Sequence, residues 1–137
     1  MDAIYTAVAT ASGDGRNGHA RTDDGLLDVD VRMPAAMGGP GGATNPEQLF
    51  AAGYAACFHS ALKSVARAGK LDVEGTEVTT RVSIGRSGVG FGLAVELDLH
   101  APNLDKETAQ KLLEQAHQVC PYSNATRGNI DVVLTVI

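Results

Sequence analysis

Polar and apolar residues alternate over residues 27–32 of this 137-residue chain, which is the period of a half-buried β-strand. Asp-Gly and Asn-Gly pairs, the strongest short hairpin signals, separate this segment from two earlier segments, 4–10 and 19–22. Three short strands are therefore predicted, over residues 4–10, 19–22 and 27–32. The same period of two predicts three further strands after a long helical segment, over residues 78–84, 91–99 and 130–136, with the first two joined by a turn at 85–88.

Start and stop signals predict a long central helix over residues 46–68, with Pro46 at its first position and Gly69 ending it. Asn45 is a good N-cap for this helix, although Thr44 and Glu47 have the spacing of a capping box instead.

A second, amphipathic helix is expected to begin at Asp105 and to end at Pro121. The element order β-β-β-α-β-β-α-β predicts an α+β fold with antiparallel hairpins, in a single domain over residues 1–137.

Composition narrows the class of protein. A net charge of −5 argues against nucleic-acid binding, because phosphate contacts need an excess of Lys and Arg. The longest apolar run, Leu49–Phe58, is about half of what crosses a membrane, and the first residues lack the basic and apolar regions of a signal peptide. We therefore expect a cytoplasmic protein with no nucleic-acid or membrane partner.

The central helix is apolar nearly all round between residues 49 and 62, so we expect it to be buried on every side. A small domain has difficulty covering such a helix alone. Small residues would let a second backbone approach closely, namely Ala51, Ala52, Gly53, Ala55 and Ala56. We infer that the helix meets its copy in a symmetric homodimer; the alternative is that the sheet and second helix of one chain cover it.

Two cysteines and two histidines invite a zinc hypothesis, with pairs Cys57-x-His59 and His117-x-x-Cys120. Residues 117 and 120 share a helix face, but residues two apart, such as Cys57 and His59, point in nearly opposite directions. A four-ligand zinc site is therefore not expected.

Cys57 taken alone would be a small buried hydrophobe. Cys120, however, falls on the apolar side of the second helix, so the two thiols can meet and form a reversible disulfide. Their roles should differ, because a helix C-terminus disfavours a thiolate at Cys120. Cys57, in the middle of a helix, needs a cation brought to it before it can react at neutral pH.

Several motifs resemble those of a known family. Residues 44–51 (TNPEQLFA) with 53–58 (GYAACF), and 119–129 (VCPYSNATRGN), resemble the two cysteine motifs of the organic hydroperoxide resistance proteins of the OsmC/Ohr superfamily. Residues 15–18 (GRNG) resemble the turn that carries their active-site arginine. The resemblance spans the whole chain, including the order of its elements.

This resemblance implies an OsmC-like, intertwined homodimer that reduces organic hydroperoxides, with no bound cofactor or metal. Cys57 would be the attacking cysteine and Cys120 the resolving one. Arg16 would activate Cys57, and Glu47 would hold Arg16; Arg127 is a second candidate cation. A lipoyl-type dithiol, often on a lipoylated protein, would restore the thiols.

Helix geometry adds an expectation about the subunits. Glu47 and Cys57 lie ten residues apart, which is about 15 Å along a straight helix. An antiparallel crossing of two copies near Ala52 would bring the partner's Glu47 level with Cys57, so we expect Glu47 and Arg16 to act across the interface. The substrate pocket is expected among large apolar residues, namely Met33, Met37, Phe50, Tyr54 and Phe58.

Three other functions remain open from the sequence. A broader OsmC-type peroxidase would use the same chemistry with looser substrate choice. An anion-binding module could use the loop Gly38–Asn45 before the helix, although this loop lacks a P-loop ending. A redox protein could use the disulfide only to change shape.

Overall fold

The computed structural model describes all residues from Met1 to Ile137. Contacts within the chain group it into two units, Met1–Leu49 and Phe50–Ile137, which we describe in turn. Each unit holds one three-stranded sheet, which is antiparallel in the first unit and mixed in the second. Together with three helices, these sheets make an α+β fold. The assignment of the whole chain to one domain stays a prediction.

The first unit holds an antiparallel sheet of β1 (Ala9–Ser12), β2 (His19–Thr22) and β3 (Asp28–Asp30). The strand predicted over 19–22 is confirmed, whereas β1 begins later than predicted and β3 is shorter than predicted. Residues 4–8 form no strand, and all of them are exposed. The apolar residues of this segment predicted a strand, but no neighbouring strand pairs with them.

Two 3-10 turns punctuate this unit, η1 (Gly15–Asn17) between β1 and β2, and η2 (Ala35–Met37) after β3. Past the end of β3, Val31 forms an isolated parallel bridge with Thr44. This bridge brings the start of the long helix back beside the small sheet.

Helix α1 runs from Pro46 to Ala68, as predicted. The side chain of Asn45 accepts a hydrogen bond of 2.9 Å from the backbone N–H of Gln48, so Asn45 is the cap. Thr44 donates to the Gln48 side chain instead of forming a capping box with Glu47. The same Asn45 bond occupies a helix N–H that an anion-binding loop would have needed.

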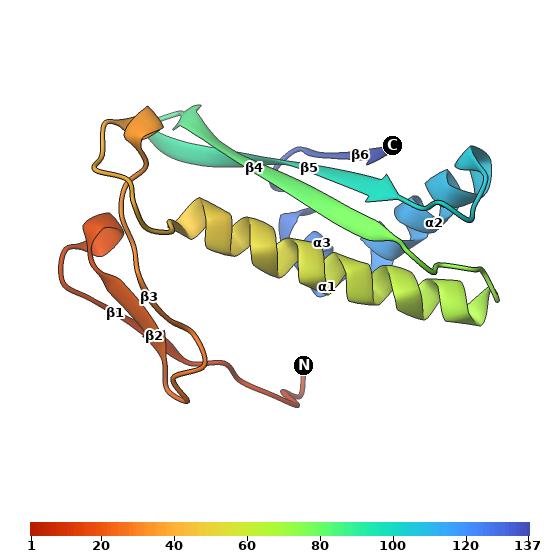
Figure 1. Cartoon of the computed structure of the whole chain (residues 1–137), viewed down its shortest axis with the longest axis horizontal. Helices are drawn as coiled ribbons and strands as arrows, with labels where there is room; N and C mark the ends of the chain where they lie inside the picture. The colour runs from red at the N-terminus through yellow and green to blue at the C-terminus, as the bar shows by residue number, and fades with distance from the viewer. The chain divides into compact units, whose positions relative to one another are not determined.

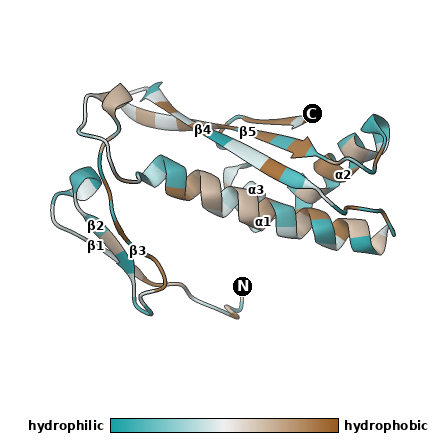
Figure 2. Ribbon diagram, in the orientation of Figure 1, coloured by the Kyte–Doolittle hydropathy of each residue, from teal (hydrophilic) through white to brown (hydrophobic).

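The second unit is built on a sheet of β4 (Glu77–Ser87), β5 (Gly90–His100) and β6 (Val132–Val136). β4 and β5 pair antiparallel over their whole length, and β6 adds parallel to β5. The turn lies at residues 88–89, not 85–88, because Gly85 and Ser87 continue the ladder opposite Gly92 and Gly90. Figure 2 shows polar and apolar bands alternating along β4 and β5.

Helix α2 (Lys106–Val119) and the short α3 (Pro121–Thr126) connect β5 to β6. The predicted start is confirmed, since the Asp105 side chain accepts from the N–H of Thr108. Neither α3 nor the parallel pairing of β6 was predicted from the sequence. Pro121 does end α2, but it also occupies the first turn of α3, where its missing N–H costs nothing.

The hydrophobic core lies against one face of the second sheet, along which α1 runs (Figure 1). Its fully buried side chains come from α1, α2 and β5, namely Tyr54, Phe58, Leu62, Val95, Leu97, Leu99, Leu112 and Leu113. On α1 these residues recur every four positions, so only one stripe is covered within the chain. Ala52 and Ala56, on another side of the helix, remain exposed.

None of the helices is both long enough and apolar enough to cross a lipid bilayer.

Candidate functional site

Two cysteines that are 63 residues apart in sequence meet in the second unit. Cys57 lies in the middle of α1, and Cys120 lies between α2 and α3. Both are free thiols, and the Cys120 thiol donates toward Cys57 with the two Sγ atoms 3.6 Å apart. The prediction that the two thiols meet is therefore confirmed. A disulfide between them needs an approach of only about 1.5 Å more.

Cys120 is fully buried, whereas Cys57 is half-buried. Burial raises the pKa of the Cys57 thiol, and the neighbouring Cys120 thiol raises this pKa further. A hydrogen bond from the backbone N–H of Tyr122, in the first turn of α3, acts in the opposite direction. The net upward shift means that Cys57 needs an added positive charge to become a thiolate at neutral pH.

Cys57 opens onto a cavity of about 370 Å³. Small or apolar side chains of α1 and of the α2–α3 junction line it, namely Ser60, Ala61, Ser64, Val119 and Pro121. This differs from the predicted pocket. Tyr54 and Phe58 are fully buried in the core, because they lie on the stripe of α1 that packs against the sheet.

Arg16 and Glu47 form a bidentate ion pair in the first unit. The two terminal nitrogens of Arg16 lie 2.8 and 2.7 Å from the two carboxylate oxygens of Glu47. Hydrogen bonding to Glu47 raises the pKa of Arg16, and hydrogen bonding to Arg16 lowers the pKa of Glu47. The pair fixes the plane of the guanidinium, whose remaining donors stay available. The side chain of Arg16 is 36% exposed.

The turn that carries Arg16 is anchored by residues that the sequence analysis did not single out. Arg32 donates from Nη1 to the carbonyls of Asn17 (3.2 Å), Gly18 (2.9 Å) and Val31 (2.6 Å). The Asn17 side chain accepts from the N–H of Met33 at 3.0 Å. In sequence, Arg32 looked like one more polar position of an alternating strand, and no signal marked it as an anchor.

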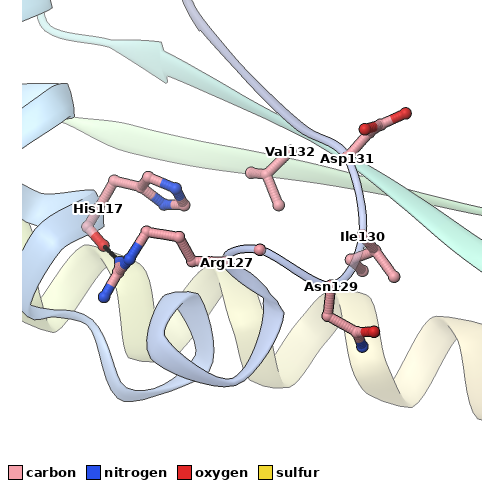
Figure 3. A pocket seen from close by; sticks show the side chains of 7 residues that line it. His117, Arg127, Asn129, Ile130, Asp131 and Val132 are labelled. Carbon is pink, nitrogen blue, oxygen red and sulfur yellow. Dashed lines mark hydrogen bonds between the residues drawn. The ribbon is translucent and has the colours of Figure 1, made fainter.

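The two histidines of the zinc hypothesis have separate partners. His59 bonds to the Thr76 hydroxyl (2.9 Å), and His117 bonds to the Ser123 hydroxyl (2.8 Å). No cluster of three or more His, Cys, Asp or Glu side chains has a metal-binding arrangement. Arg127 donates to the carbonyl of His117 and to the side chain of Asn124, beside a hollow of about 410 Å³ (Figure 3).

Comparisons with known proteins show the family of this chain. Residues 39–135 match the family model described as OsmC-like protein. The organic hydroperoxide resistance protein of Xanthomonas axonopodis pv. citri is 55% identical over 135 residues, covering 97% of this chain and 94% of the relative. The chain belongs to the OsmC/Ohr family. Several of its relatives carry the name organic hydroperoxide resistance protein.

Solved OsmC/Ohr structures share the fold throughout. An organic hydroperoxide resistance protein from Legionella pneumophila superposes with a TM-score of 0.94 at 54% identity, and 98% of each chain is covered. A chain from Vibrio cholerae O1, with captopril bound in one of its active sites, gives a TM-score of 0.93 at 53% identity. The match covers 99% of this chain and 94% of the Vibrio chain.

Proposed function

We propose that this protein is a cysteine-based peroxidase that reduces alkyl and fatty-acid hydroperoxides to alcohols. One observation carries the proposal. Two reduced thiols from distant parts of the chain lie 3.6 Å apart, one beside a cavity and the other fully buried. This asymmetry suits a first cysteine that meets substrate and a second that waits for the product.

In the first step the Cys57 thiolate attacks the O–O bond of the hydroperoxide. The bond breaks, an alkoxide leaves and takes up a proton as the alcohol, and Cys57 becomes a sulfenic acid. In the second step Cys120 attacks the Cys57 sulfur. A disulfide forms, and the hydroxyl leaves as water with the thiol proton of Cys120.

Arg16 supplies the positive charge that the half-buried Cys57 lacks, and its free donors can bind the peroxide oxygens. Glu47 is the positioning residue that orients it. Since helix geometry separates Glu47 from Cys57 by about 15 Å on one α1, we propose that the Arg16–Glu47 pair serves the Cys57 of the other subunit in a homodimer. The exposed Ala52 and Ala56 leave a face of α1 free for such a crossing.

The cavity beside Cys57 favours organic over small inorganic peroxides, because small and apolar groups line it. A lipoyl-type dithiol, free or on a lipoylated protein, would reduce the disulfide by thiol exchange and release the enzyme for another cycle. No bound cofactor takes part in these steps. We place the protein in the cytoplasm, where such dithiols persist.

A turnover assay tests the proposal, using tert-butyl hydroperoxide with dihydrolipoamide. Cys57→Ser should abolish peroxide consumption, while Cys120→Ser should allow one turnover and accumulate sulfenic acid. Full activity of Cys57→Ser would exclude the mechanism. Absence of any turnover by the wild-type protein would favour a redox protein whose disulfide only changes its shape.

A broader OsmC-type peroxidase is the second candidate. Its substrate preference would be loose, so hydrogen peroxide and tert-butyl hydroperoxide would react at similar rates. The mainly apolar lining of the cavity supports a peroxidase specific for organic hydroperoxides. A ratio near one between the rates with tert-butyl hydroperoxide and with hydrogen peroxide would contradict that specificity.

A further inference from the structure

A chain of buried hydroxyl groups ties α1 to α3 next to the two cysteines. The Tyr54 hydroxyl lies 2.8 Å from the Ser123 hydroxyl and 3.0 Å from the Thr126 hydroxyl. Tyr54 and Ser123 are fully buried, and Thr126 is 4% exposed. Buried hydroxyls left without partners are costly, so these two bonds hold the two helices together in one arrangement.

His117 extends this chain toward the surface. Its Nδ1 lies 2.8 Å from the Ser123 hydroxyl, and its ring borders the hollow in Figure 3. Arg127 donates to the carbonyl of His117 at 2.8 Å, which fixes the end of α2.

Counting donors gives the chain a single direction. Thr126 donates to the carbonyl of Ser123, so its oxygen accepts from Tyr54. The Tyr54 hydroxyl must then accept from Ser123, whose oxygen accepts in turn from Nδ1–H of His117. Each hydroxyl hydrogen is used once, and the assignment holds for the neutral Nδ1–H tautomer and for the protonated ring.

The chain sits in register with the thiol pair. Tyr54 is three residues before Cys57 on α1, and Ser123 is three residues after Cys120, in α3. Each spacing is close to one helical turn. The hydrogen bonds therefore join the turn beside Cys57 to the turn beside Cys120, although no member of the chain bonds to either sulfur.

We propose that Tyr54, Ser123 and Thr126 are positioning residues for the resolving step, and that they set how fast Cys120 closes on oxidised Cys57. The proposal rests on the function proposed above. The sulfurs must come from 3.6 Å to about 2.05 Å while the S–O bond of the sulfenic acid breaks and water leaves. α3 is only six residues long, so its position depends on these anchors more than on its own backbone bonds.

The test compares Tyr54→Phe with the wild type and with Tyr5→Phe, a matched change at an exposed tyrosine. One equivalent of tert-butyl hydroperoxide is added, the reaction is quenched at intervals, and intact mass gives the sulfenic, disulfide and sulfinic forms. For Tyr54→Phe we expect peroxide consumption within about twofold of wild type and disulfide formation about tenfold slower. In a separate reaction with excess peroxide, sulfinic acid should accumulate in Tyr54→Phe but not in the wild type or in Tyr5→Phe.

Thr126 provides the conservative rescue. Thr126→Val should reproduce the slow closure, whereas Thr126→Ser, which keeps the hydroxyl, should close at the wild-type rate. Disulfide formation at the wild-type rate in Tyr54→Phe would overturn the proposal. Equal slowing of peroxide consumption and disulfide formation would also overturn it, because that result indicates general loosening of the fold.

A second measurement does not depend on peroxidase activity. Equilibration with reduced and oxidised dithiothreitol gives the effective concentration of one thiol at the other, which we expect to fall about tenfold in Tyr54→Phe. An unchanged value would contradict the positioning role even if the wild type consumed no peroxide. Failure of the proposed function would give a different result. The wild-type protein would then form the Cys57–Cys120 disulfide when oxidised dithiothreitol is the oxidant, but not when hydroperoxide is.

Discussion

Two glycines flank the turn that carries Arg16, and they answer different needs of the backbone. Gly15 has a φ of 56°, the left-handed region, with open space where a side chain would be. Gly18 has an ordinary negative φ, but a Cβ there would overlap the carbonyl oxygen of Ser12 and crowd the N of Asp14. These contacts are with backbone atoms, which cannot move aside cheaply.

Gly18→Ala should therefore displace the turn and separate Arg16 from Glu47. We expect a loss of at least about tenfold in hydroperoxide turnover, given the value of a charge-assisted bidentate pair. Gly15→Ala is the matched control. Its left-handed φ should cost only about 1–2 kcal/mol of stability, and the added Cβ would meet no neighbouring atom. The activity and urea-unfolding midpoint of both variants check this; equal activities would show that the turn tolerates the displacement.

At the scale of single elements, β4 carries a buried polar group without a partner. The Thr80 hydroxyl makes no hydrogen bond, and Thr80 faces the core opposite Leu97. Thr80→Val keeps the shape and removes the unsatisfied group, so we expect a gain of about 1 kcal/mol in the free energy of unfolding. Thr79→Val, on the exposed face, should change it by less than about 0.5 kcal/mol. Urea titration measures both, and a destabilised Thr80→Val would indicate that the hydroxyl has a partner.

The small sheet of the first unit depends on pH through one histidine. His19 on β2 bonds from its two ring nitrogens to Asp30 (2.8 Å) and Asp28 (2.5 Å) on β3. The hydrogen bond to Asp30, and to a smaller extent the one to Asp28, raises the pKa of His19 above 6.5. Arg21 also lies near Asp28, at 3.5 Å.

Because the folded pKa of His19 is raised, its contribution to stability is complete below the unfolded value near 6.5. It is lost as the pH rises through the folded pKa. Amide exchange in β2 and β3, corrected for intrinsic rates, should therefore speed up relative to α2 above that pH. His19→Gln should remove this dependence; a titration of His19 by NMR with a midpoint below 6.5 would contradict the expectation.

Elements with strong local signals could be predicted from sequence, and those that depend on partners could not. The helix over 46–68 was predicted from its cap, the proline at its first position and its stop. The strand expected over 4–10 was mostly wrong, because a short apolar segment does not by itself supply a pairing strand. α3 was missed because Pro121 and Asn124 are typical of loops. The meeting of Cys57 and Cys120 was predicted from helix faces, whereas the anchors Arg32 and Ser123 carry no sequence signal of their role.

At the scale of the whole molecule, the proposed dimer makes a sharp prediction for mixed subunits. If Arg16 serves the partner's Cys57, a heterodimer of Cys57→Ser and Arg16→Ala chains contains one intact site. Random exchange of the two inactive variants should then restore about a quarter of wild-type activity, since about half of the dimers are mixed. If Arg16 serves its own chain, mixing restores nothing. Sedimentation under the assay conditions shows whether dimers are present.

The separation of the two thiols by 63 positions in the sequence has one more consequence. Closing a loop of that length by a covalent bond removes entropy from the unfolded chain, which raises the stability of the folded protein by at most about 4 kcal/mol. The oxidised protein should therefore melt at a higher temperature than the reduced one. Each catalytic cycle would alternate between a more and a less heat-resistant form. A thermal melt, with no label and no substrate, would then report what fraction of the protein is waiting for its reductant.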